Sequence, residues 1–318
     1  MINKILLIIG VTLVYSVNLY SQDSRYVPFS IDQTKTLNPP SEVSSSVDDA
    51  VILNVNFNVI KNILQQKGEN IYLVVPVNTS RTVTANLKKF ELLAPGARIV
   101  SGTRNGDKEI QINEFTAYAG NIPELENSHI AISFFEDYVS GIMTTKNDSY
   151  VLGKLGGNSD ANYILYRVSK MKVQHGFECG SEALEIPSRI ADIQKSLSPQ
   201  AKDFSTSTLL KADIAVESDY DTYEHFGNSV QNASRYLLSL MVPVSAIYVR
   251  DINLQLFVSY LRVWSDPNDP YNGTTSFQLL SQFRSYWNAN MQNVPRTLAH
   301  YICTRPGGLG GVAWLDVL

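Results

Sequence analysis

The pattern of apolar and polar residues differs between the two halves of the chain. From Asn70 to Val168, short apolar runs alternate with turn signals such as Pro95-Gly96 and Asn105-Gly106-Asp107. This spacing is typical of an all-β domain, either a β-sandwich or a barrel. Ahead of it, residues 51–66 predict a strand followed by a short helix, and residues 41–49 a polar spacer. The predicted strands of this half are Ile71 to Val77, Thr82 to Phe90, Ile110 to Tyr118, His129 to Phe135, Tyr138 to Thr144, Tyr150 to Leu155 and Tyr163 to Val168.

Strands and helices alternate after a polar tract at residues 181–210. The first helix is predicted to begin near Asp221 and Glu224, which have the spacing of a capping box, and to be kinked by Pro243. The predicted order is strand Ala212 to Glu217, helix Asp221 to Tyr248, strand Ile252 to Tyr260, helix Phe277 to Met291 and strand Thr297 to Cys303. We therefore expect a β-rich domain followed by an α/β domain, with a mixed, mainly parallel sheet and two long helices.

The N-terminus has the pattern of a secretory signal peptide. Lys4 supplies a positive charge, Ile5 to Val17 is apolar, and Leu19-Tyr20-Ser21 offers a cleavage site. A membrane anchor is the alternative, but this apolar run is shorter than the roughly 20 residues that a bilayer requires. We expect residues 1–21 to be removed, leaving a secreted, extracellular chain with no membrane span.

Charge and cysteine content exclude two classes of protein. The chain carries 26 basic and 30 acidic residues, a net charge of −4, and no dense basic run, so a nucleic-acid partner is not expected. Its two cysteines, Cys179 and Cys303, are too few for a disulfide-built scaffold.

Four segments of the second half resemble one protein family. They are Ile214-Ala215-Val216-Glu217-Ser218-Asp219, then Tyr223-x-x-Phe226-Gly227-Asn228, then Ala299-His300-Tyr301-Ile302-Cys303-Thr304, and finally Gly311-Val312-Ala313-Trp314. Together they are similar to the metzincin zinc metalloproteases, in particular the reprolysin or adamalysin-like branch that includes the ADAM proteases. In the first half, segments 115–120, 128–133, 141–143 and 150–152 follow the order seen in reprolysin pro-regions.

The resemblance implies the precursor of a secreted zinc metalloendopeptidase. Residues 22–180 would form the pro-domain, 181–210 a linker cut by an activating protease, and 211–318 the first part of a metzincin catalytic domain, which would act on protein or peptide substrates. The family binds zinc through H-E-x-x-H-x-x-G-x-x-H, and its glutamate activates a zinc-bound water. No histidine in the chain has this spacing (His129, His175, His225 and His300). The motif and the catalytic glutamate are therefore expected beyond Leu318, and this chain alone is expected to be inactive; an enzyme that has lost its motif is the alternative.

Cys179 is the candidate inhibitory residue. In Phe177-Glu178-Cys179-Gly180 it resembles a cysteine switch, whose thiolate would ligate zinc in the latent form. A buried cysteine, or a disulfide to Cys303, is the alternative. Cys303 itself could be a free core thiol or bond to a cysteine beyond Leu318.

Two further sites follow from the resemblance. The strand Gly310, Gly311, Val312, Ala313 and Trp314 would pair with an extended substrate, although residues 307–311 also suit a flexible loop. Asp213 falls where the family often carries a calcium ligand, but Thr297 stands where a second acid would be expected. Asp266 and Asp269 could instead bind an ion in their loop, or form a solvated turn.

A second function class remains open. The chain could be a non-catalytic secreted adhesion or binding protein, in which a β-sandwich domain grips a surface and the second half supports it.

Overall fold

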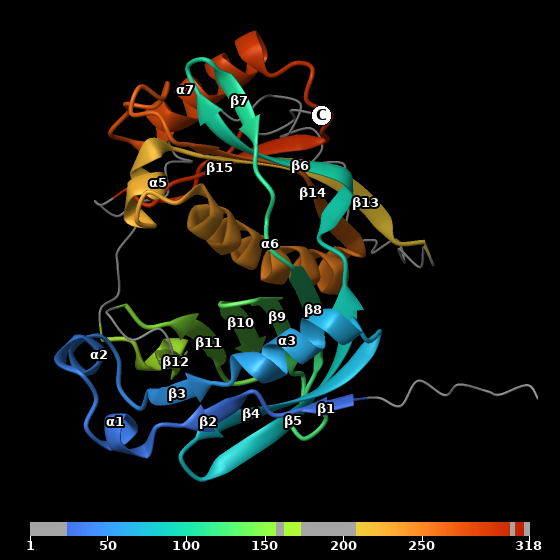
Figure 1. Ribbon diagram of the computed structural model, residues 1–318, viewed down its shortest axis with the longest axis vertical. Coiled ribbons are helices and arrows are strands. Elements are labelled where there is room, and N and C mark those ends of the chain that lie inside the picture. Colours follow the sequence, from blue (N-terminus) through green and yellow to red (C-terminus); the bar gives the residue numbers. More distant parts are fainter. Residues whose placement is uncertain (1–23, 157–161, 173–207, 306–308, 315–318) are drawn as a thin grey trace, which may run out of the picture.

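Two β-sheets lie one above the other, with helix α6 (Val230–Ile252) between them (Figure 1). The computed structural model describes residues 24–156, 162–172, 208–305 and 309–314. Apolar residues of both sheets and of α6 belong to one buried cluster, so the helix joins the sheets into a single packed unit. No helix of the described residues combines the length and the apolar character needed to cross a bilayer.

The larger sheet has ten strands and curls around its own core. All neighbours are antiparallel except the parallel pair β1 and β4, so the sheet is mixed. Its order is β1 (Ser24–Tyr26), β4 (Asn70–Asn78), β5 (Arg81–Phe90), β8 (Phe115–Asn121), β9 (His129–Phe135), β10 (Val139–Thr144), β11 (Ser149–Lys154), β12 (Asn162–Arg167), β3 (Val51–Val55) and β2 (Phe29–Ile31).

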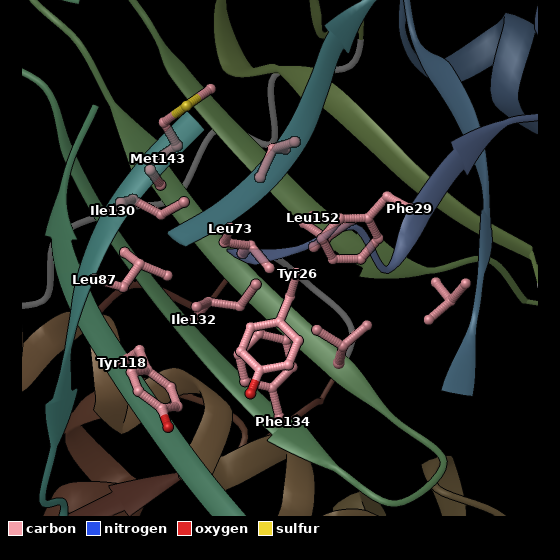
Figure 2. Close-up of a cluster of buried hydrophobic side chains, with 14 of the residues drawn as sticks. Tyr26, Phe29, Leu73, Leu87, Tyr118, Ile130, Ile132, Phe134, Met143 and Leu152 are labelled. Atoms are coloured by element: carbon pink, nitrogen blue, oxygen red, sulfur yellow. The ribbon is translucent and has the colours of Figure 1, made fainter. Parts of the chain in front are cut away.

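Buried side chains fill the inside of this curl. Figure 2 shows Leu73 of β4 and Ile132 and Phe134 of β9 among the residues that point into it. Helix α3 (Phe57–Gln66) adds its apolar face to the same cluster. Three short helices connect the strands: α1 (Gln33–Leu37), α2 (Ser41–Ser46) and the 3-10 turn η1 (Val168–Lys170).

The smaller sheet has five strands, drawn from both halves of the sequence. Its order is β15 (Leu298–Ile302), β13 (Leu210–Ser218), β14 (Leu254–Trp264), β6 (Leu93–Thr103) and β7 (Gly106–Glu109). The first four strands are parallel to one another, and β7 pairs with β6 as a hairpin. Helix α6 packs with one buried cluster of this sheet and α7 (Ser276–Asn290) with another, while α5 (Tyr220–His225) follows β13.

The predicted fold class is wrong. The described residues are mainly strands, in one ten-stranded mixed sheet and one five-stranded sheet, and they include only six α-helices. The chain is therefore not a β-rich domain followed by a mainly parallel α/β metzincin domain with two long helices. One physical reason is that β6 leaves its neighbours in sequence and pairs with β14, and β7 pairs with β6, so the second sheet is not built from residues 211–318 alone. The predicted linker falls largely in residues 173–207, outside the described residues, and the domain boundaries stay a prediction.

Individual elements follow the sequence more closely. All seven strands predicted in the first half have a counterpart, and β9 has the predicted bounds. The single long helix predicted from Asp221 is wrong in its continuity: helix begins at Tyr220 as predicted to within one residue, but Gly227 (φ 70°) and Asn228 (φ 57°) adopt left-handed backbone and separate α5 from α6. The spacer at residues 41–49 contains α2.

Candidate functional site

The carboxyl ends of β13, β14 and β15 meet at one edge of the five-stranded sheet, because the three strands are parallel. Ligand sites in open parallel sheets gather at this edge. Glu217 and Asp219 lie here at the end of β13, both 0% exposed. They form the centres of two buried polar networks, which make this edge the candidate functional site of the described residues.

The first network surrounds the Glu217 carboxyl group. Its Oε1 accepts hydrogen bonds from Trp264 Nε1 (2.6 Å) and the Tyr271 hydroxyl (2.7 Å), and its Oε2 accepts one from Trp287 Nε1 (2.5 Å). Burial raises the pKa of Glu217, whereas the charge of Arg262 and these donors act against that shift. Because an indole N–H can only donate, the surroundings are built for the carboxylate form.

Arg262 lies between two acids. Its Nη1 is 3.5 Å from Glu217 Oε1, and its Nε is 2.9 Å from Asp107 Oδ1 on β7. The guanidinium carbon lies 4.0 Å from the centre of the Trp264 ring, and Tyr260 donates its hydroxyl proton to Asp107. Only 3% of the Arg262 side chain is exposed, so these partners carry the compensation that a buried charge requires.

The second network surrounds Asp219. Its Oδ1 accepts from the backbone N–H and the hydroxyl of Thr222, so Asp219 is the N-cap residue of α5. Its Oδ2 accepts from the Tyr301 hydroxyl and from Arg305 Nε, each at 2.7 Å. Arg305 also donates to the backbone carbonyl of Tyr271 (2.6 Å), so the two networks meet at that residue.

These two networks fix structure and offer no reactive group to a substrate. Both central carboxylates are fully buried, and both accept bonds on each of their oxygens. They hold the ends of β13, β14 and β15, the loop between β14 and α7, and the β6–β7 hairpin in one arrangement. Such an edge is suited to positioning other residues.

The described residues show no cluster of metal-ligating side chains. No group of three His, Cys, Asp or Glu side chains in this part of the chain comes together as a ligand set. Cys179 and His175 lie outside the described residues, and the inhibitory role of Cys179 stays a prediction. Asp213 is exposed on β13; its backbone N–H donates to the Thr297 hydroxyl at 3.1 Å, and the Thr297 N–H donates to the Asp213 carbonyl at 2.7 Å. Its calcium role likewise stays a prediction.

The segment predicted as a substrate-binding strand packs against α7. Residues 310–314 are not part of any strand in the described structure, and Ser276 Oγ donates to the Gly310 carbonyl at 2.6 Å. The Trp314 ring lies 5.9 Å from Phe277 and 5.0 Å from the Arg284 guanidinium. The outermost strand of the sheet on this side is β15. Substrate binding by Gly310, Gly311, Val312, Ala313 and Trp314 stays a prediction.

The remaining candidates take structural positions. Cys303 is a free, half-buried thiol whose pKa is raised by burial. Asp269 accepts from the backbone N–H groups of Tyr220 and Tyr271, and Asp266 accepts from Asn268, so both carboxylates stabilise their loop. The other histidines lie apart: His225 ends α5, His300 lies on β15, and burial lowers the pKa of His129 on β9.

The sequence analysis missed the networks. Glu217 entered it as the last residue of a predicted strand and as part of a resembling segment, and Arg262 lies beyond the predicted strand Ile252 to Tyr260. The signal was present, because Arg262 stands between Leu261 and Val263, and Glu217 directly follows the apolar run Ile214 to Val216. A charged residue in a buried strand requires a partner, and that rule would have drawn attention to both.

Comparisons with known proteins give no family. No protein-family model matches the sequence. No curated protein matches it either. Among solved structures, the chain is similar to metalloproteinase-II from Bacteroides fragilis, with 13% identity, a TM-score of 0.36, and coverage of 76% of this chain and 66% of that chain. The chain thus spans just under two thirds of that protein, and a likeness this distant establishes neither a shared fold nor a shared activity.

Proposed function

We propose that this chain is part of the precursor of a secreted, zinc-dependent metalloendopeptidase. The proposal rests on the sequence resemblance, and one structural observation supports it. Segments 214–219 and 299–304, which carry the resemblance and lie far apart in sequence, are parallel neighbours, with Ile214 opposite Leu298 and Ser218 opposite Ile302. These two resembling segments therefore lie side by side at the candidate edge.

In this proposal the described residues supply a scaffold. The Glu217 and Asp219 networks hold the strand ends beside which a substrate-binding region and an inhibitory segment with Cys179 would lie. The zinc ligands would come from residues outside the described part, since no ligand set exists within it. The proposal concerns the activity and does not depend on the α/β fold class.

The test uses the product of the natural gene, including any coding sequence that follows residue 318. After purification, bound zinc is measured by mass spectrometry, and cleavage of a fluorogenic peptide library is measured before and after limited trypsin treatment. We expect about one zinc per chain, as in mononuclear catalytic sites. We also expect trypsin-dependent cleavage that 1,10-phenanthroline abolishes and added zinc restores.

The matched control is the chain that ends at Leu318, which we expect to bind no catalytic zinc and to cleave nothing. A gene product with neither zinc nor chelator-sensitive cleavage would refute the peptidase. Binding of that product to glycans or cell surfaces would then favour the adhesion protein.

A further inference from the structure

The five-stranded sheet contains strands from both sides of residues 173–207. We call residues 24–172 the N-terminal part and residues 208–314 the C-terminal part. Strand β6 of the N-terminal part runs parallel to β14, with Tyr260 opposite Arg98 and Trp264 opposite Gly102. At the two ends of this ladder, the backbone N–H of Val258 donates to Leu92 at 2.8 Å and that of Ser265 to Gly102 at 3.0 Å.

Strand β14 would become an edge strand without β6. Its residues Val258, Tyr260 and Val263 are at most 2% exposed, and they stand on both faces of the sheet. Loss of β6 would leave the ladder groups of a buried strand unpaired, which costs free energy and favours aggregation. Ile99 and Val100 of β6 extend the two apolar clusters that lie on opposite faces of the sheet.

Side chains also link the N-terminal part to β14. Arg262 of the C-terminal part has its nearest acid, Asp107, in the N-terminal part, at 2.9 Å against 3.5 Å for Glu217. Gln255 Nε2 donates to the backbone carbonyl of Glu91 at 2.6 Å. Leaving a buried charge without a partner strongly destabilises the folded protein. The pairing of Asp107 with Arg262 therefore helps to hold β7 against the C-terminal part.

Helix α6 forms a second contact between the parts. It lies on the ten-stranded sheet (Figure 1), where Ser133 of β9 donates to Ser239 of α6 at 3.1 Å. Arg235 of α6, with only 9% of its side chain exposed, pairs with Asp137 at 2.6 Å. Apolar residues of β9 and α6 share one buried cluster.

We propose that the N-terminal part stays bound to the C-terminal part after the chain is cut between them, so that cutting alone does not separate the two. A flexible connection contributes an effective concentration of about 1 mM, whereas well-packed interfaces hold with dissociation constants from about 1 µM to 1 pM. The shared ladder, the buried ion pair and the shared apolar core are features of well-packed interfaces, which bind with these low dissociation constants. This inference goes beyond the proposed function, because it requires no peptidase activity.

The test cuts the folded full chain. A recognition sequence for a site-specific protease is placed within residues 173–207, and the purified protein is cleaved and run on size exclusion at about 1 µM, the weak end of that range. We expect one peak at the elution volume of the uncut protein, which contains both fragments on a denaturing gel. Two separate peaks, or precipitation of the C-terminal fragment, would overturn the proposal.

Two variants on the β7 hairpin test the role of Asp107. Asp107→Asn removes the charge that faces Arg262, and we expect it to weaken binding between the cut parts by about tenfold or more. Glu109→Gln is the matched control, because Glu109 is 57% exposed and pairs with Arg98 inside the N-terminal part, and we expect less than about a twofold change. If both changes weakened the binding equally, the ion pair between Asp107 and Arg262 would not contribute to holding the parts together. The cut but unsubstituted chain tests the association even if Asp107→Asn does not fold. Because elution is the readout, failure here is distinct from failure of the peptidase proposal, which is read by zinc and cleavage.

Discussion

Replacing Glu217 by glutamine tests whether the buried network is ionic. Glutamine keeps the shape of the side chain but puts an NH2 group, which only donates, in place of one oxygen. Trp264 and Tyr271 both donate to Oε1, whereas Trp287 alone donates to Oε2. The orientation with least conflict therefore places the amide nitrogen against the Trp287 N–H, and that buried donor loses its acceptor.

The expected loss has two sources. A buried donor without an acceptor costs about 1–3 kcal/mol. Removing one partner of a buried ion pair costs about 3–5 kcal/mol, but Arg262 keeps Asp107 at 2.9 Å, so only part of that cost applies. We expect Glu217→Gln to lower the free energy of unfolding by about 3–4 kcal/mol in total. With an unfolding entropy of about 2.1 cal/mol/K per residue over 318 residues, the melting temperature should fall by about 5 °C.

Urea unfolding at neutral pH, followed by far-UV circular dichroism, measures this loss. Near-UV circular dichroism adds a local readout, because two of the three tryptophans bond to Glu217. Glu114→Gln is the matched control: Glu114 is 46% exposed and pairs with Lys67 at 3.3 Å, so its loss should cost less than about 1 kcal/mol. Were Glu217 protonated at neutral pH, glutamine would imitate it closely. Equal stability of Glu217→Gln and Glu114→Gln would therefore refute the ionic network.

Two further predictions concern the ten-stranded sheet. Burial raises the pKa of Tyr118 from 10.0 to about 12, so its contribution to stability is complete below pH 10 and is lost as the pH rises toward 12, by about 1.4 kcal/mol per unit. Urea unfolding across this range should show the loss, Tyr118→Phe should reduce its slope, and a wild-type stability that does not change with pH would contradict it. In Gly120→Ala, the new Cβ would stand 2.0 Å from the Asn86 carbonyl oxygen, so we expect a loss of about 3 kcal/mol or more. Gly153→Ala, with nothing within 4 Å, should change the free energy of unfolding by less than about 0.5 kcal/mol, and similar results for both changes would show that β5 and β8 adjust freely.

Local patterns predicted most strands, because the alternation of apolar and polar residues lies within each strand's own sequence. Strand β9, and strand β3 just before helix α3, follow from apolar runs bounded by turn residues. Strand β6 was missed because Pro95-Gly96 is a turn signal, yet the strand passes through Gly96 at a φ of 75°. Its partner, β14, lies more than a hundred residues away: the bond from Gln255 to Glu91 spans 164 positions. No local pattern records such a partner.

The candidate site was less accessible to sequence reasoning than the strands. The resemblance directed attention to Cys179 and to residues 310–314, of which the first lies outside the described residues and the second packs on α7. The charges that organise the edge were overlooked, because a single Glu or Arg in a strand reads as a solvent-facing position. Only the folded structure shows that Glu217 and Arg262 are buried and face each other.

The position of Asp107 bears on what counts as a folding unit in this chain. Glu217 already accepts three hydrogen bonds from Trp264, Tyr271 and Trp287, and it is the more distant of the two acids that face Arg262. The C-terminal part therefore buries a cation whose closest counter-charge it does not itself contain. Its central strand β14 also takes one of its two neighbours from the N-terminal part. A boundary at residues 181–210 describes where the backbone is predicted to be cut, whereas these contacts predict that the two parts fold and unfold together, as one cooperative unit.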